Sequence, residues 1–205
     1  MVEVTASETG GSRAEVRRGQ VIEAARECFR TSGFHGASMV EIATAAGMSV
    51  GQIYRCFANK EAVIAAIVEQ GLAERIDHIA ALEQAARENG QDLAAASAEV
   101  KGRKPADPAE DVRRAALTLE IVAEAARNPT VACIVQRSDS TLLGRTAEVI
   151  AAARPHWSPE RVRATISVIT ALYEGWMQRA IAAPGSLTPE AEQLRANLVA
   201  YALQP

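Results

Sequence analysis

The stretch that decides the fold is residues 38–60, SMVEIATAAGMSVGQIYRCFANK. Its first part predicts a short helix, since Ser38 is a good N-cap and Glu41 follows three residues later, as in a capping box. Gly47 is expected to end this helix, because glycine adopts the positive φ that other residues resist. After a tight turn, a second short helix is predicted over Val50–Phe57. The stretch therefore predicts a helix-turn-helix.

The second helix begins with small or polar residues, Val50, Gly51 and Gln52. A recognition helix needs such residues at its start so that this turn can approach base edges. A glycine inside a helix costs roughly 1 kcal/mol relative to alanine, so Gly51 indicates that something approaches closely. The alternative is an ordinary helical hairpin in a core, with Tyr54 and Phe57 as packing aromatics.

Helices are also predicted on both sides of this stretch. Ser12, with Glu15 three residues later, is expected to cap a first helix that ends at Gly33, and Asn59 is expected to cap a fourth. Further amphipathic segments follow, separated by proline and glycine. The prediction is an all-α protein of about nine helices. The expected parts are a disordered arm (1–11), a three-helix DNA-binding domain (12–60) and a C-terminal helical ligand-binding and dimerisation domain (61–205).

Composition supports the all-helical prediction. The chain has 205 residues, of which 48% are hydrophobic, 23% charged and only 4% aromatic. This balance is that of a globular protein, and few aromatic residues disfavour a sheet. No segment approaches the roughly 18 consecutive apolar residues of a membrane span, and the polar N-terminus does not resemble a secretory signal. Three widely spaced cysteines suit free thiols. A cytoplasmic protein is expected.

The net charge of −3 hides an uneven distribution. Residues 1–60 hold seven Lys or Arg against six Asp or Glu, whereas residues 61–205 hold 15 against 19. The first part is therefore positive by one and the remainder negative by four. The relative excess of positive charge therefore lies in the first third of the chain.

The run G-x-S-x-G-x-I-Y-R-x-F-x-N-K-E, residues 47–61, resembles the DNA-binding signature of the TetR family of bacterial transcriptional regulators. The resemblance covers roughly residues 13–65 in motif terms, and the remainder is similar to the family only in length and helical plan. It implies an all-α dimer that binds operator DNA. It also implies that Ile53 and Phe57 pack inward against the first helix.

The resemblance implies DNA-binding roles residue by residue. Ser38 is expected to touch phosphate, Tyr54 to reach the backbone or a thymine methyl group, and Lys60 to hold a phosphate. Cys56 departs from the family pattern, which often has a Tyr or His that donates to phosphate there. A thiol is a poor donor, so Arg55 is the candidate replacement. The residues expected to face the major groove are Ser49, Val50, Gly51 and Gln52.

A dimer interface is expected on the last two helices. The helix predicted over Pro159–Ala182 carries two apolar stripes and must be covered on more than one side. Two such helices with the last helix of each subunit can form a four-helix bundle, as the family and operator symmetry imply. The alternative is that both stripes are buried within one subunit. The expected interface residues are Ile166, Leu172, Gly175, Leu194, Leu198 and Tyr201.

A small, largely apolar ligand is expected to bind in the C-terminal domain, with Glu120 as a polar group that orients it. A plain hydrophobic core is the alternative. The expected lining residues are Leu117, Glu120, Ile121, Tyr173, Trp176 and Met177.

Other kinds of site are not indicated by the sequence. The three histidines are far apart and lack metal-ligand spacing, and neither a phosphate-binding glycine loop nor a nucleophile elbow is present. No enzyme activity, metal or cofactor is expected. The favoured function is a homodimeric DNA-binding regulator, most simply a repressor released from a near-palindromic operator by a small molecule. The alternatives are a helical small-molecule-binding protein or enzyme without DNA binding, and a protein-interaction module.

Overall fold

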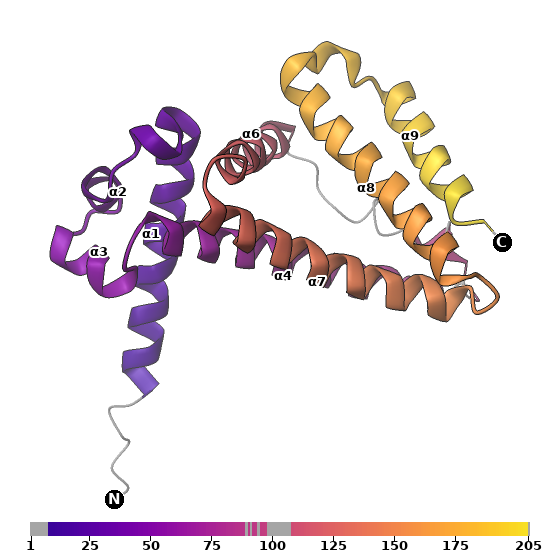
Figure 1. Cartoon of the computed structure of the whole chain (residues 1–205), viewed down its shortest axis with the longest axis horizontal. Helices are drawn as coiled ribbons and strands as arrows, with labels where there is room; N and C mark the ends of the chain where they lie inside the picture. Colours follow the sequence, from indigo (N-terminus) through magenta and orange to yellow (C-terminus); the bar gives the residue numbers. More distant parts are fainter. Residues whose placement is uncertain (1–7, 89, 91, 94, 98–107, 205) are drawn as a thin grey trace, which may run out of the picture. The chain divides into compact units, whose positions relative to one another are not determined.

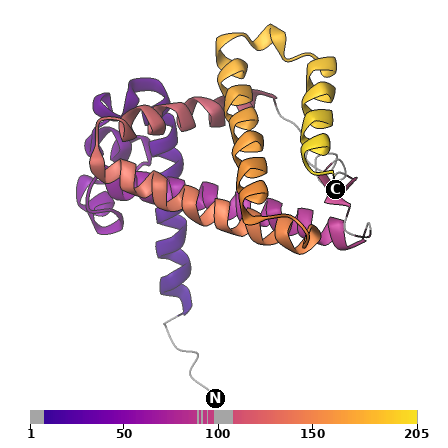
Figure 2. The ribbon, with the colours of Figure 1, turned by 45° about the vertical axis from the view of Figure 1, so that its right-hand side comes forward.

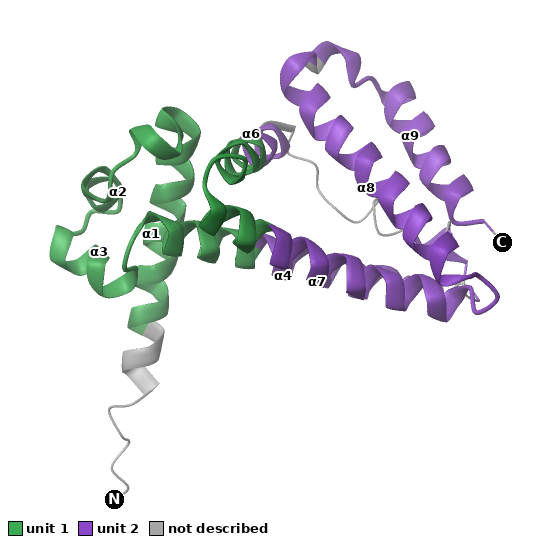
Figure 3. Ribbon diagram, in the orientation of Figure 1, with its two compact units in different colours: residues 1–70, 117–135 green, residues 71–116, 136–205 purple. Residues whose placement is uncertain are grey.

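The computed structural model describes residues 8–88, 90, 92–93, 95–97 and 108–204. These residues form helices joined by short turns and contain no strand, so the all-α prediction is confirmed (Figure 1). None of the described helices is long and apolar enough to span a membrane. The chain divides into two compact units, coloured separately in Figure 3.

Unit 1 comprises Met1–Gln70 and Leu117–Val135. It contains the helices α1 (Glu8–Gly36), α2 (Met39–Ala45) and α3 (Val50–Cys56). It also contains the beginning of α4 (Lys60–Glu88), the end of α6 (Pro108–Ala125) and the beginning of α7 (Pro129–Ala153). One apolar cluster joins these helices; its largest fully buried members are Phe29, Ile42, Ile53, Ile64, Val21, Val63 and Val131.

Unit 2 comprises Gly71–Ala116 and Gln136–Pro205. It ends with α8 (Pro159–Ala182), a short 3-10 helix (Pro184–Ser186) and α9 (Pro189–Ala202). The helices α8 and α9 lie side by side in both Figure 1 and Figure 2. The buried Arg154 joins α7 to the end of α9, because its guanidinium donates to the carbonyl oxygen of Leu203 from Nη2 (2.7 Å) and Nε (3.2 Å). A second apolar cluster fills this unit, with Trp157, Val162, Ile166, Val199 and Leu203 among its members.

The start of α1 differs from the prediction. Residues 1–7 of the predicted arm lie outside the described residues, whereas residues 8–11 belong to α1. Ser12 is therefore inside the helix and does not cap it. An added helical turn offers carbonyl groups to the same N–H groups that a Ser12 cap would have satisfied. The predicted stop is present as a break within α1, since Gly33 has φ 68 and ψ 171.

The compact units do not follow the predicted division at residue 60. Unit 1 continues to Gln70 and includes Leu117–Val135, whose Leu117 and Ile121 are buried in the same cluster as the helix-turn-helix. An amphipathic pattern shows which face of a helix is apolar but not which neighbour covers it. For that reason the sequence placed this whole segment in the C-terminal domain.

Candidate nucleic-acid interface

The two helices of the helix-turn-helix begin with capping boxes. At α2, Ser38 Oγ accepts a hydrogen bond from Glu41 N (3.1 Å), and Glu41 Oε2 accepts one from Ser38 N (2.7 Å). Hydrogen bonds to its carboxylate lower the pKa of Glu41, the bond from the Ser38 backbone N–H most and that from the Ser38 side chain next. At α3, Ser49 and Gln52 make the equivalent pair, with Ser49 N donating to Gln52 Oε1 (2.8 Å). Both predicted starts are confirmed, and each satisfies N–H groups that a helix end leaves free.

The turn between α2 and α3 depends on Gly47, which has φ 66 as predicted. Its N–H donates to the Thr44 carbonyl (3.1 Å), and the next N–H, of Met48, donates to the Ala43 carbonyl (2.9 Å). These bonds satisfy carbonyl groups at the end of α2 within a short turn. The turn therefore passes directly into the Ser49 cap of α3.

One side of α3 is buried. Ile53 is completely buried and Phe57, the residue that follows α3, nearly so, and both belong to the apolar cluster of unit 1. The prediction that they pack inward is confirmed. Cys56 is half-buried against the same cluster. These contacts fix the rotation of α3 about its axis and so determine which residues face outward.

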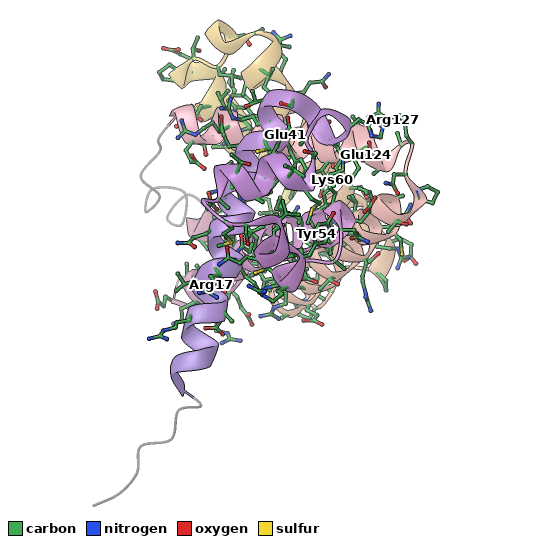
Figure 4. All side chains as sticks on the ribbon, turned by 90° about the vertical axis from the view of Figure 1, so that its left-hand side faces the viewer. Arg17, Glu41, Tyr54, Lys60, Glu124 and Arg127 are labelled. Atoms are coloured by element: carbon green, nitrogen blue, oxygen red, sulfur yellow. The ribbon has the colours of Figure 1, made fainter. Side chains whose placement is uncertain are left out.

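The opposite side of α3 is open. Tyr54, labelled in Figure 4, is 52% exposed, and the side chains of Val50 and Arg55 are exposed as well. At Gly51, an added Cβ would meet no heavy atom within 4 Å, so nothing within the described structure requires glycine there. Gln52 is only half-exposed, and its Oε1 is engaged by the Ser49 backbone. The N-terminal edge of α3 is thus free to approach another molecule.

Arg18 of α1, which the sequence reasoning missed, contacts the C-terminal end of α3. Arg18 of α1 donates from Nη1 to the carbonyl oxygen of Cys56 (2.8 Å), and its guanidinium lies 4.2 Å from the ring centre of Phe57. It therefore satisfies a carbonyl at the end of α3 and stacks on its C-cap residue. No local sequence pattern indicates this pairing, because the partners are 38 residues apart. Arg17, on the preceding position, is exposed and has no partner among the described residues.

Lys60 contacts the backbone beside the break in α1. Its Nζ donates to the carbonyl oxygens of Phe34 (2.6 Å) and Ala37 (2.8 Å), and it lies 4.4 Å from the centre of the Phe34 ring. The ammonium group is therefore engaged by the protein and does not extend outward as a phosphate ligand would. The prediction identified a cation at the start of α4, but it could not foresee the free carbonyls beside it.

The comparisons with known proteins agree with this arrangement. A family model described as "Bacterial regulatory proteins, tetR family" matches residues 21–67, and one described as "BetI-type transcriptional repressor, C-terminal" matches residues 104–203. Together they cover more than half of the chain. The chain belongs to the TetR family. Both the predicted family and the predicted fold class are thereby confirmed.

Two curated relatives and two solved structures illustrate the TetR likeness. The regulator UidR of Escherichia coli K12 is 32% identical over 138 residues, which is 64% of this chain and 63% of UidR. The activator FasR of Mycolicibacterium smegmatis is 34% identical over 80 residues, 39% of this chain and 36% of FasR. Salmonella enterica GusR shares the fold with TM-score 0.68 and 22% identity, covering 98% of this chain and 99% of GusR. A regulator from Pseudomonas aeruginosa PAO1 has TM-score 0.72 and 21% identity, covering 92% and 89%. The alignment thus spans less than two thirds of the UidR length.

The residues expected to line a ligand site in this TetR-family chain are not brought together in one unit. Leu117 and Ile121 are buried in the apolar core of unit 1. Glu120 accepts a hydrogen bond from the backbone N–H of Phe34 (2.8 Å), so its carboxylate is engaged within unit 1. The remaining three residues, Tyr173, Trp176 and Met177, belong to unit 2.

A buried arginine accompanies those aromatic residues of unit 2. The guanidinium of Arg195, on α9, lies 4.9 Å from the ring centre of Tyr173 and 4.9 Å from that of Trp176, both on α8. Arg195 Nε is buried and has no hydrogen-bond partner in the described structure. The sequence reasoning missed this residue, because an arginine on a helix is normally expected to be exposed to solvent.

The residues expected at a dimer interface divide into two groups. Ile166 is buried within the apolar cluster of unit 2 and Leu172 packs partly against it, so Ile166 is unavailable to a second subunit. The core of its own unit covers that stripe of α8. Leu194, Leu198 and Tyr201 are exposed by 65%, 57% and 74%. Gly175 is also exposed, and a Cβ there would meet no heavy atom within 4 Å.

Proposed function

We propose that this chain is a sequence-specific DNA-binding regulator of transcription, with α3 as its recognition helix. The observation that carries the proposal is the exposed N-terminal edge of α3. The same helix buries Ile53 on its other side, and α2 and α3 each begin with a capping box. Ser49, Val50, Gly51 and Gln52 would approach base edges, while Tyr54 and Arg55 would reach the backbone. Ser38 is exposed at the start of α2, where it would contact a phosphate.

A homodimer supports this function best. Leu194, Leu198 and Tyr201 on α9, together with Val168 and Tyr173 on α8, form a set of exposed apolar side chains that a second copy would cover. A two-fold dimer would place two α3 helices in successive major grooves, about 34–36 Å apart, on a near-palindromic operator. The experiment is molar-mass measurement in solution: Leu198→Glu should give monomers, whereas the control Leu119→Glu, also an exposed leucine, should remain dimeric.

A small ligand acting through unit 2 is the proposed signal. Tyr173, Trp176 and Met177 offer apolar surface there, and Arg195 offers a cation. A ligand can weaken operator binding only by its preference for the state that binds DNA poorly. The C-terminal family model describes a repressor, which favours repression. Such a regulator would act on the chromosome in the bacterial cytoplasm.

The function is tested by binding to the DNA upstream of the protein's own gene. We expect a sequence-specific, salt-sensitive complex at sub-micromolar protein. Gln52→Ala should relax base preference, whereas Arg55→Ala should weaken binding to all sequences and reduce the salt slope by about 0.9. Arg163→Ala, an exposed arginine of unit 2, is the matched control and should change neither. Absence of any specific complex would refute the proposal.

The alternative of a helical carrier or enzyme without DNA binding is not favoured. That reading requires the outer side chains of α3 to lie in the interior, and Tyr54 is exposed.

A further inference from the structure

The break in α1 leaves a buried peptide group outside the helical hydrogen-bond ladder. Gly33 has φ 68 and ψ 171, so the chain leaves its helical path immediately before Phe34. Phe34 is buried, with only 4% of its surface exposed. Buried backbone N–H and C=O groups must find partners, because leaving one unpaired costs as much as a lost hydrogen bond. Phe34 therefore needs partners from elsewhere in the chain.

Two side chains from different helices supply those partners. Glu120 of α6 accepts from the Phe34 N–H (2.8 Å), and Lys60 of α4 donates to the Phe34 carbonyl oxygen (2.6 Å). The same ammonium group also donates to the Ala37 carbonyl oxygen (2.8 Å) and lies over the Phe34 ring. We name Phe34, Lys60 and Glu120 the Phe34 clamp. Both bonds involve a charged group, which makes them stronger than bonds between neutral groups.

The clamp holds the segment that leads directly into the helix-turn-helix. Ala37, which Lys60 also binds, immediately precedes Ser38, the N-cap of α2. The Glu120 carboxylate lies close against Gly33, since a Cβ there would come within 3.1 Å of its Oε1. One turn further along α6, the buried Glu124 lies 3.5 Å from His35 Nε2 and 3.3 Å from Arg127 Nη2. Figure 4 labels Lys60, Glu124 and Arg127. Movement of α6 relative to α1 would therefore strain the entry into α2.

We infer that Lys60 and Glu120 are positioning residues, which set the orientation of α2 and α3 through Phe34 and themselves touch no DNA. This inference rests on the proposed DNA-binding function. It assigns Lys60 a role other than the phosphate contact that its motif suggests. It also makes α6 a part of the DNA-binding unit, because one of the two clamp side chains comes from that helix.

Loss of the Glu120 charge and loss of the clamp should change DNA affinity in opposite directions. Glu120 carries negative charge, so removing it should by itself strengthen binding to a polyanion. Loss of the clamp acts in the opposite direction. Glutamine keeps an acceptor oxygen at the same position, whereas methionine has similar length and no comparable acceptor. The two substitutions therefore separate the hydrogen bond from the charge.

The test measures operator dissociation constants over a salt series, below the melting temperature of every variant and corrected for the active fraction. We expect Glu120→Met to bind about tenfold more weakly and Glu120→Gln within about twofold of the wild type. Glu110→Ala, which removes an exposed carboxylate from the first turn of the same helix, is the matched control and should not weaken binding. Glu120→Met binding as well as Glu110→Ala would overturn the inference.

Lys60→Met separates the clamp from a phosphate contact. A phosphate contact would reduce the slope of log affinity against log salt by about 0.9, since one fewer counterion is released. The clamp predicts about tenfold weaker binding with an unchanged slope, and less than additive loss when Lys60→Met is combined with Glu120→Met. A reduced slope for Lys60→Met would overturn its positioning role.

Amide hydrogen exchange tests the clamp without DNA. The Phe34 N–H should exchange slowly in the wild type and in Glu120→Gln, and much faster in Glu120→Met. If the wild type binds no operator, the proposed function fails, while the exchange result still stands for the clamp. If the wild type binds and the Phe34 amide is equally protected in all three proteins, the clamp fails alone.

Discussion

Replacing Gly33 by alanine should destabilise unit 1 by about 3 kcal/mol. Its φ of 68 with ψ of 171 falls in a region almost confined to glycine, where another residue bears about 1–3 kcal/mol of strain. The new Cβ would also lie 3.1 Å from Glu120 Oε1, the atom that accepts from Phe34. The carboxylate must then move by a few tenths of an ångström, which weakens its bond to the buried Phe34 N–H. Complete loss of that bond would cost about 1–3 kcal/mol. Alanine also restricts the unfolded chain, which offsets about 0.4–1 kcal/mol of this destabilisation.

Two other glycines serve as references for this measurement. Gly19 lies inside α1 without a positive φ, and an added Cβ would meet nothing within 4 Å, so Gly19→Ala should stabilise unit 1 by about 1 kcal/mol. Gly47→Ala has the same open space but φ 66, and should cost about 1–2 kcal/mol. The expected order of stability is therefore Gly19→Ala, wild type, Gly47→Ala and Gly33→Ala.

The assay is urea unfolding followed by far-ultraviolet circular dichroism. A chain of two units can show two transitions, so the variants are compared on the transition that Gly19→Ala shifts upward. Phe34 amide exchange reports separately whether the Glu120 contact is lost. Gly33→Ala unfolding within about 0.5 kcal/mol of the wild type would refute the reasoning, because substitutions away from such constraints fall in that range.

Three further predictions concern buried and titrating groups. Arg154→Ala should lower the free energy of unfolding of unit 2 by about 2–4 kcal/mol, because the Leu203 carbonyl loses its charged donors; an unchanged denaturation midpoint would contradict this. Cys28 should react with a disulfide reagent more slowly than the exposed Cys133 at neutral pH, since burial first, then the charges of Glu41 and Glu27, raise the pKa of Cys28; equal rates would count against it. The hydrogen bonds from Ser38 that lower the Glu41 pKa stabilise α2 above the unfolded-state pKa of about 4.3, and this stabilisation should be lost as the pH falls through the lowered folded-state value. Carbon-13 titration should show the Glu41 pKa rising in Ser38→Ala, and no change would argue against the capping box.

Local signals in the sequence predicted much of the interface. The capping residues Ser38 and Ser49 lie within a few residues of their partners, and the positive φ of Gly47 is a property of that residue's own backbone. Ser158 and Thr188, each followed by proline, cap α8 and α9, and α8 spans the predicted Pro159–Ala182. Such features depend on neighbours along the chain, so one sequence is sufficient to read them.

Contacts between distant segments could not be read in the same way. Lys60 and Glu120 were each assigned to an external partner, because a charged side chain on a helix does not reveal the free backbone groups it meets. Those groups exist only because Gly33 breaks α1 at the place where α4 and α6 pass. The apolar stripe containing Ile166 had the same ambiguity, since periodicity cannot tell a subunit's own core from a second copy.

Unit 1 is built from two separate segments of the chain, and this affects how DNA specificity can be exchanged between related regulators. The backbone passes between the two units three times, after residues 70, 116 and 135, so no single junction separates them. A chimera that takes only the first 60 or 70 residues from another regulator would join a foreign Phe34 environment to the native Glu120. Transfer of a functional DNA-binding unit should require residues 117–135 to be transferred together with residues 1–70.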